Sequence, residues 1–362
     1  MPIQIHGWGT AHPPFFATQD QAAQAAAMLW AEALDRGNAV RALYRRTDVQ
    51  TRYSSILNRQ SDGELPDQSF YHPATGPEDR GPTTAARMQR YEACATALGT
   101  QACETALAES GLPRESITHL VTVSCSGFSA PGFDIGLIQA LNLPRTVSRS
   151  HIGFMGCHGA LNGLRVARAF AAQNPGSRVL VCCVELCSLH QQYTIEPQQV
   201  VANALFSDGA AAVVLSEGTT KTNWNLDDQY SELIPDTHSF MTWRIGDHGF
   251  EMTLSPETPG LFQSLINSSI STWLSLHNLT VPEIQSWAIH PGGPRILTSA
   301  ADGLGIDRRH LATSQSVLSK YGNMSSPTIL FILNQLRQTK DSRPCVALAF
   351  GPGLTLEAAL FR

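Results

Sequence analysis

The feature of this sequence best suited to chemistry is a cysteine between glycines, Gly156-Cys157-His158-Gly159. An extended run at residues 146–152 precedes it, and apolar residues at helical spacing follow it through residue 173. A thiol at a helix N-terminus faces unpaired N–H groups and the positive end of the helix dipole. Its pKa then falls from about 8.5 toward neutrality. The segment therefore predicts a nucleophilic thiolate at Cys157, although a buried structural cysteine beside a tight turn fits the same residues.

Three segments of the C-terminal half carry further polar residues at the ends of expected elements. His290 ends an apolar strand and is followed by Pro291-Gly292-Gly293. Asn323, in Asn323-Met324-Ser325-Ser326, opens a helix, and residues 349–355 form a glycine-rich turn between two strands. Taken singly, His290 also fits a core histidine and Asn323 a plain helix cap.

The periodicity of apolar residues predicts the elements that must position these side chains. We expect strands at residues 3–8, 119–126, 146–152, 178–185, 210–216, 286–289, 345–350 and 355–361. We expect helices at residues 22–34, 84–110, 133–141, 157–173, 197–206, 260–277, 294–304, 310–321 and 324–340. Near-continuous apolar strands alternating with helices predict an α/β sheet covered on both faces. Two similar halves, joined near residues 218–225, suggest a duplicated fold.

Composition limits the class of protein and its compartment. The chain has 362 residues, of which 43% are hydrophobic and 15% charged, so it can bury a large core. A net charge of −5 argues against a nucleic-acid or anionic-membrane partner, though not against one basic patch. The eight cysteines follow no disulfide spacing, and we see neither a signal peptide nor an apolar run of about 18 residues. We therefore expect a soluble, cytoplasmic protein.

Two clusters of side chains raise the question of ligands. The densest basic cluster comprises Arg41, Arg45, Arg46 and Arg52, and it fits either a solvated helix face or an anion site. The second cluster comprises Cys182, Cys183, Cys187 and His190. Its spacing matches no standard zinc motif and much of it lies on a buried strand. We interpret it as core and cavity wall and expect no metal site.

Taken together, Cys157, His290 and Asn323 resemble the catalytic set of the chalcone and stilbene synthase family, the type III polyketide synthases. The separation of 33 residues between His290 and Asn323 matches the family pattern, and the resemblance runs from about residue 3 to the C-terminus. It implies a thiolase-like, duplicated αβαβα layered fold. Its halves would be residues 1–217, carrying Cys157, and residues 218–362, carrying His290 and Asn323.

The resemblance also implies a reaction. The Cys157 thiolate takes an acyl group from a coenzyme A (CoA) thioester, and decarboxylation of malonyl-CoA supplies the carbanion that extends it. His290 and Asn323 are donors for the enolate oxygen, and a protonated His290 could pair with the thiolate at rest. The implied enzyme is a homodimeric acyltransferase. It needs no metal or redox cofactor, and its product cyclises to a pyrone, resorcinol or related polyketide.

Residues that bind substrate are carried over by position. Phe206 matches the gatekeeper phenylalanine between the CoA tunnel and the cavity, although core packing at a helix end is an alternative. The other expected substrate-binding residues are Met252 at the second gatekeeper position, Trp243, Cys125, Cys187, His190 and Ser325. Arg46, and next to it Arg45, are expected to bind the CoA phosphates.

Departures from the plant pattern bear on the product. Met252 replaces a phenylalanine, Trp243 a cavity glycine, and Cys125, Cys187 and His190 replace threonines. Ala349 replaces the first glycine of the usual GFGPG loop. These changes weaken the case for chalcone or resveratrol as the product. They favour an aliphatic starter, or malonyl itself.

Other enzymes use related residues. A ketoacyl-ACP synthase III-like enzyme also carries Cys/His/Asn, and it makes one condensation or joins carrier-bound chains, so an acyl carrier protein is a possible donor. Papain-like hydrolases use the same trio to activate water. A binding module that has lost catalysis is disfavoured, because all three residues are present.

Overall fold

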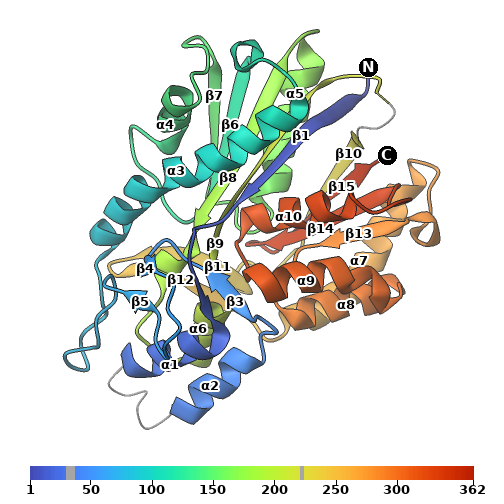
Figure 1. Cartoon of the computed structure of the whole chain (residues 1–362). Helices are drawn as coiled ribbons and strands as arrows, with labels where there is room; N and C mark the ends of the chain where they lie inside the picture. Colours follow the sequence, from blue (N-terminus) through green and yellow to red (C-terminus); the bar gives the residue numbers. More distant parts are fainter. Residues whose placement is uncertain (30–36, 221–223) are drawn as a thin grey trace.

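The computed structural model describes residues 1–29, 37–220 and 224–362 (Figure 1). The strands are β1 (Ile3–Ala11), β2 (Phe16–Thr18), β3 (Thr51–Tyr53), β4 (Leu57–Arg59), β5 (Asp67–Gln68), β6 (His119–Ser124), β7 (Ser148–Gly153), β8 (Arg178–Leu186), β9 (Asp208–Glu217), β10 (Trp224–Leu233), β11 (Met241–Gly246), β12 (Gly249–Leu254), β13 (Ser286–Ile289), β14 (Cys345–Gly351) and β15 (Thr355–Phe361). The α-helices are α1 (Gln19–Leu29), α2 (Gly37–Arg45), α3 (Thr84–Ser110), α4 (Phe133–Ala140), α5 (Gly159–Gln173), α6 (Pro197–Leu205), α7 (Thr258–Ser275), α8 (Pro294–Leu304), α9 (Ala312–Tyr321) and α10 (Ser326–Leu336).

Within residues 1–29, 37–220 and 224–362, the main sheet has nine strands in the order β13-β14-β15-β10-β1-β9-β8-β6-β7. In one arm β6 pairs in parallel with β8, and β8 pairs antiparallel with β9. In the other arm β13 pairs in parallel with β14, and β14 pairs antiparallel with β15. The arms meet where β1 and β10 pair antiparallel. The two arms therefore repeat one strand pattern.

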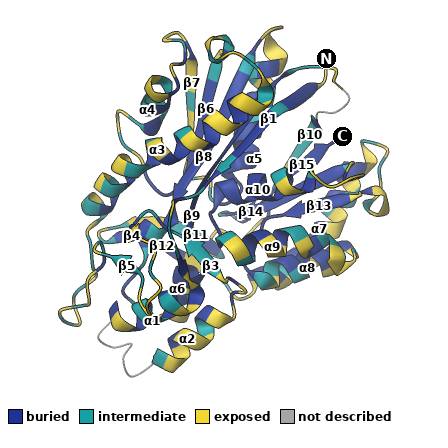
Figure 2. Ribbon diagram, viewed as in Figure 1, coloured by how far each residue is buried: buried dark blue, intermediate teal, exposed yellow. Residues whose placement is uncertain are grey.

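Alternation along the strands shows which helices cover which face. Leu180, Cys182 and Val184 of β8 pack into a cluster with α3, whereas Val179, Val181 and Cys183 pack with α5 and α10. In the second arm, Ala347 and Ala349 of β14 join that same central cluster, while Val346 and Leu348 face α7 and α8. The chain therefore forms five layers, which are helix α3, the first arm of the sheet, helices α5 and α10, the second arm, and helices α7 and α8. The predicted αβαβα architecture is confirmed, and Figure 2 shows its inner strands, such as β8, β9 and β14, buried, whereas the edge strand β7 is largely exposed.

Most predicted elements are present with small differences at their ends. The long helix α3 begins after the cap residue Thr83, whose hydroxyl accepts from Ala86 N, and ends at Gly111 in the left-handed conformation. The capping box of Thr18 and Gln21 forms at the start of α1, while the predicted end of that helix, near residue 34, lies outside the described residues.

The prediction missed strands β10 to β12. β10 carries Asp227, Asp228 and Gln229 and is held mainly by backbone pairing with β15, so no apolar run marks it. β11 and β12 form a hairpin around Asp247-His248, which alternation and the flanking glycines could have revealed.

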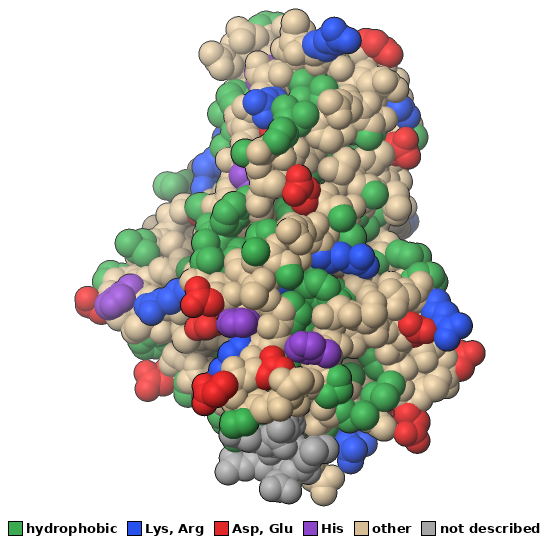
Figure 3. All heavy atoms as spheres, turned by 90° about the vertical axis from the view of Figure 1, so that its left-hand side faces the viewer, with side chains coloured by type: hydrophobic (Ala, Val, Ile, Leu, Met, Phe, Trp, Pro, Cys, Tyr) green, Lys and Arg blue, Asp and Glu red, His purple; other side chains and the backbone are tan. Residues whose placement is uncertain are grey.

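Within the described residues, the surface shows no region of one charge sign on the face drawn in Figure 3. On the face drawn in Figure 3, basic and acidic side chains are interspersed. Within the described ranges, no helix is both long and apolar enough to cross a membrane.

Candidate active site

Cys157 stands in a tight turn between β7 and α5, two residues before the helix begins. Gly156 has a φ of 88°, and a Cβ atom built on it would lie 2.4 Å from Cδ of Pro352. Only glycine fits there without strain, and its absent side chain lets the 351–353 turn pack against the cysteine segment. The predicted position of Cys157, just before a helix N-terminus, is confirmed.

The predicted effect on the thiol is wrong. Burial, together with the charge of the nearby Glu185 carboxylate, raises the pKa of Cys157 to about 11. Hydrogen bonds from Ser325 and Asn323 lower this pKa, but by less than burial raises it. Because Cys157 is only 7% exposed, removing its thiolate from water raises the pKa by more than Ser325 and Asn323 lower it. The resting protein therefore holds a neutral thiol.

Asn323 is fixed by backbone and side-chain contacts on both sides. Its segment bridges to Phe206: Asn323 N donates to Leu205 O at 2.9 Å, and Ser207 N donates to Asn323 O at 2.9 Å. Its side-chain Oδ1 accepts from Ser325 N at 2.8 Å. Because the amide oxygen is taken, the amide NH₂ is the end left to donate, and the Asn323 side chain lowers the pKa of the Cys157 thiol, as a nearby donor does.

His290 follows the last residue of β13, and its backbone N donates to Leu348 O at 2.8 Å. The side chain is 1% exposed, and neither ring nitrogen has a hydrogen-bond partner among the described residues. Burial, together with a smaller charge interaction with His158, the neighbour of Cys157, lowers the pKa of His290 to about 3. The imidazole is therefore neutral, and the expected resting pair of imidazolium and thiolate is not supported. Two free ring nitrogens remain for a ligand.

Glu185, at the end of β8, was missed by sequence reasoning although it is fully buried beside Cys157. Its carboxylate accepts from Cys125 N at 2.9 and 3.0 Å, from Ser126 Oγ at 2.6 Å and from Ser326 Oγ at 2.7 Å. Burial raises its pKa to about 7, against these hydrogen bonds. The sequence signal that could have identified Glu185 is a charged residue near the end of an otherwise apolar strand.

The cavity at Cys157, here called the catalytic pocket, has about 360 Å³ of empty space, part of it open to solvent. It brings together seven predicted residues: Cys125, Cys157, Cys187, Phe206, Trp243, Met252 and Ser325. Glu185 and Pro352 also line it, whereas His290 and Asn323 are buried without lining it.

Trp243 and Met252 face each other across the β11–β12 hairpin. Trp243 Nε1 donates to Cys125 O at 2.7 Å, which fixes the indole in the wall. The cavity residues predicted from separate segments are therefore joined by a hairpin that the sequence analysis did not identify.

His190 has a structural role, because both of its ring nitrogens are already hydrogen-bonded and neither is free to act as a base. Its Nε2 lies 2.6 Å from Ser126 O, and its Nδ1 accepts from Phe250 N at 3.0 Å. The ring stacks on Phe250 with centroids 4.1 Å apart, and burial lowers its pKa to about 3. Cys182 and Cys183 point to opposite faces of β8, as their core clusters show.

The two predicted CoA-binding arginines are exposed at the end of α2. Arg45 pairs with Asp20 at 3.5 Å and lines a surface groove together with Pro294 and Leu297 at the start of α8. That helix begins four residues after His290, so the groove lies on the His290 side of the molecule. Arg46 does not line the groove.

Comparison with known proteins identifies the class first. Residues 19–219 match the N-terminal domain of chalcone and stilbene synthases, and residues 225–362 match their C-terminal domain. The chain belongs to the chalcone and stilbene synthase family and is a type III polyketide synthase.

Individual relatives agree with this assignment. The chain is similar to the alpha-pyrone synthesis polyketide synthase-like Pks18 of Mycobacterium tuberculosis, with 34% identity over 76% of this chain and 72% of that protein. It is 31% identical to type III polyketide synthase C of Arabidopsis thaliana, over 88% and 84% of the two chains. The crystal structure of PKS-I from the brown alga Ectocarpus siliculosus superposes with a TM-score of 0.92 at 30% identity, covering 100% of this chain and 98% of that one.

Proposed function

We propose that this type III polyketide synthase loads an acyl-CoA starter on Cys157, extends it with malonyl-CoA and releases a cyclised pyrone, resorcinol or related product. The observation that carries the proposal is the surroundings of Cys157. The side chains of Ser325 and Asn323 lower the pKa of its thiol, and a buried histidine with two unpartnered ring nitrogens lies near the adjoining His158. The name of the mycobacterial relative, an alpha-pyrone synthesis enzyme, favours a pyrone.

Loading begins with Cys157 and His290 both neutral, because burial raises the pKa of the thiol and lowers the pKa of the imidazole. Neutral His290 takes the proton as the sulfur of Cys157 forms its bond to the thioester carbon. The bond between that carbon and the CoA sulfur breaks, and the departing sulfur takes the proton back from His290. The starter is then a thioester of Cys157, and His290 is neutral again.

Extension uses the same groups as hydrogen-bond donors. The carbon–carbon bond to the carboxylate of malonyl-CoA breaks, carbon dioxide leaves, and its electrons form an enolate on the thioester oxygen. Neutral His290 can donate one N–H to that oxygen, and the Asn323 amide can donate another because its Oδ1 is occupied by Ser325 N. The enolate carbon attacks the Cys157 thioester, which leaves the lengthened chain on CoA and expels the cysteine as a thiolate. The thiolate takes a proton from water and returns to the neutral thiol.

Substrates reach this site as CoA thioesters in our proposal. The groove lined by Arg45 offers a cation to the CoA phosphates, with Arg46 as a nearby second. None of the steps calls for a metal or redox cofactor. We further propose that the enzyme works as a cytoplasmic homodimer, and that Trp243 and Met252 restrict starters to aliphatic groups or malonyl.

The test is an incubation of the protein with malonyl-CoA and a graded panel of acyl-CoAs, followed by product masses. We expect products longer than the starter by more than one two-carbon unit. His290→Ala and Asn323→Ala should each suppress acetyl-CoA formation from malonyl-CoA by on the order of 10²-fold. A single condensation, or activity only with carrier-protein thioesters, would establish the ketoacyl synthase III-like alternative instead.

A further inference from the structure

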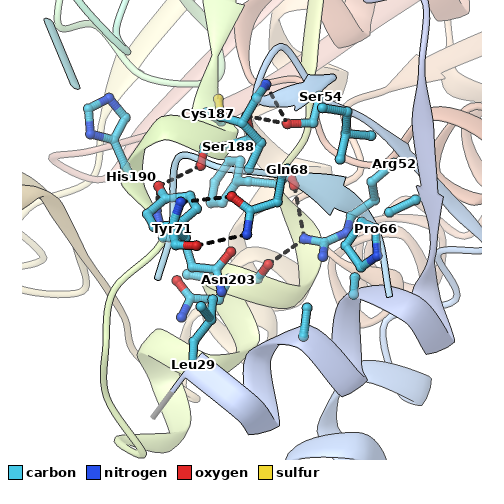
Figure 4. Close-up of a pocket in the computed structure, with 18 of the residues that line it drawn as sticks. Leu29, Arg52, Ser54, Pro66, Gln68, Tyr71, Cys187, Ser188, His190 and Asn203 are labelled. Carbon is cyan, nitrogen blue, oxygen red and sulfur yellow. Dashed lines mark hydrogen bonds between the residues drawn. The ribbon is translucent and has the colours of Figure 1, made fainter. Parts of the chain in front are cut away.

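A second cavity, here called the outer pocket, lies between α1, β3, β4 and α6 and has about 770 Å³ of empty space, part of it open to solvent (Figure 4). Cys187, Phe206 and Trp243 line both this cavity and the catalytic pocket, so they form the partition between the two. Cys157 does not line the outer pocket. The loading and extension steps proposed above therefore leave this cavity without a role.

Arg52 gives the outer pocket a positive charge that no acidic side chain of the wall balances. Among the described residues that line the cavity, Arg52 is the only arginine or lysine, and none is an aspartate or glutamate. His190 also lines it but is neutral, because burial lowers its pKa to about 3. Arg52 forms no ion pair with any residue of the described ranges.

The carboxylate that interacts with Arg52 through charge is already occupied. Asp208 attracts the guanidinium without forming an ion pair with it, and it does not line the outer pocket. Its oxygens accept hydrogen bonds from the backbone N and the hydroxyl of both Ser55 and Ser188, at 2.7 to 2.8 Å. A buried cation without a paired anion is costly, so a ligand that brings a negative charge is favoured here.

The contacts of Arg52 leave one edge of its guanidinium without an acceptor. Nη1 donates to Asn203 O (Figure 4) and, at 3.2 Å, to Phe206 O. Nε is buried and has no hydrogen-bond partner among the described residues. The ring of Tyr44 lies against the guanidinium, with its centroid 5.4 Å from Cζ, and its hydroxyl stays neutral because burial raises its pKa. The free edge of Nε and Nη2 matches the two oxygens of a carboxylate.

The rest of the wall indicates what the anion is attached to. Polar groups there bond to the protein itself: Ser54 Oγ donates to Ser188 Oγ at 2.7 Å, and Gln68 exchanges hydrogen bonds with the backbone of Tyr71 at 2.7 and 2.8 Å. The aliphatic members of the wall are Ala17, Ala22, Ala25, Leu29, Ile56, Leu57 and Ala202. An inorganic anion would leave that surface facing water, whereas the hydrocarbon part of an organic acid covers it.

We propose that the outer pocket is a binding site for an organic carboxylate, with the carboxylate oxygens on Nε and Nη2 of Arg52 and the hydrocarbon part against the aliphatic wall. Two sources carry this group, a free carboxylic acid and the far carboxyl group of a dicarboxylic thioester substrate. Only the second source rests on the proposed function. Arg45 is different, because it lines the surface groove and pairs with Asp20.

Binding of hexanoate, measured by titration calorimetry near neutral pH, tests the site. Hexanamide is the matched probe, because it has the same carbon skeleton without the charge. We expect wild type to bind hexanoate on the order of 10-fold tighter than hexanamide or more, and Arg52→Gln to abolish this preference. Arg59→Gln is the control and should keep it, because Arg59 of β4 is exposed, pairs with Asp67 and does not line the pocket.

Arg52→Lys covers the case in which Arg52→Gln folds poorly. It keeps the positive charge but replaces the two-pronged donor edge with a single ammonium group. Hexanoate should therefore bind to it several-fold more weakly than to wild type, while hexanamide binds equally to both.

Steady-state kinetics identify the source of the carboxylate, with adipoyl-CoA compared with the amide of its far carboxyl group. A higher kcat/KM for adipoyl-CoA that Arg52→Gln removes assigns the carboxylate to a substrate, whereas hexanoate binding without that preference assigns it to a free acid. The proposal is overturned if wild type prefers neither hexanoate nor adipoyl-CoA over its amide, or if Arg52→Gln keeps the preference in full. Failure of condensation with every thioester would refute the proposed function and leave the hexanoate result standing, so the two failures are distinct.

Discussion

The pH dependence of Cys157 alkylation separates two views of the nucleophile. Near pH 8, a thiol with a pKa of about 11 is ionised only to ~10⁻³, against ~0.2 for an ordinary cysteine. We therefore expect iodoacetamide to modify Cys157 on the order of 10²-fold more slowly than a model thiol, and about tenfold faster for each added pH unit. Rates come from mass spectrometry of the peptide that carries Cys157.

Glu185 should also affect the alkylation rate, because its pKa of about 7 makes its charge depend on pH near neutrality. Above that pH its carboxylate is negative and disfavours the thiolate, whereas below it the carboxyl is neutral. Glu185→Gln should therefore speed alkylation by roughly threefold or more near pH 9 and leave it unchanged near pH 6. Ser326→Ala is the control, because it removes one hydrogen bond to Glu185 without removing a charge.

A rate that is already level between about pH 6 and 9 would refute this reasoning. That result would mean that the helix terminus, or a protonated His290, lowers the pKa of Cys157 by more than burial raises it. Equal effects of Glu185→Gln at acidic and alkaline pH would show that the carboxyl acts through structure rather than charge.

Three further predictions concern the turn, the groove and the cavity. Gly156→Ala should abolish condensation and lower the unfolding temperature, whereas Gly176→Ala, at the same φ of 88° but with nothing within 4 Å, should keep activity. Arg45→Ala should raise the KM for malonyl-CoA more than it lowers kcat, and more than Arg46→Ala does, since only Arg45 lines the groove; equal KM values in steady-state assays would contradict this. Trp243→Gly should shift product masses toward bulkier starters or one more extension with decarboxylation nearly unchanged, and an unaltered product spectrum would count against a cavity role.

The sequence was enough to predict the regular elements around the site. β13, α8 and β15 have the predicted bounds, because apolar runs there end at glycine, proline or polar residues. Cys157 is at the predicted turn because Gly156 can adopt a positive φ. Such signals are local, and local patterns are what single-sequence reasoning detects.

Properties set by distant contacts were not predicted. The thiol pKa of Cys157 depends on how deeply β6, β8 and α10 enclose it, and no short segment encodes that. Glu185 becomes part of the site only because Cys125 and Ser326, far apart in sequence, meet at its carboxylate. The cavity lined by Ala22 of α1, Leu57 of β4 and Asn203 of α6 likewise arises from segments that meet only in the folded chain. Whether the chain divides functionally at residues 217 and 218 stays a prediction.

Intact-protein mass spectrometry after brief incubation with a saturated acyl-CoA tests whether Cys157 is the nucleophile. Wild type should gain the mass of one acyl group, peptide mapping should place it on Cys157, and later addition of malonyl-CoA should remove it as extended product. Cys157→Ala should gain no mass. Acylation of the Cys157→Ala variant, or a label on wild type that malonyl-CoA cannot remove, would contradict the assignment of Cys157 as the nucleophile.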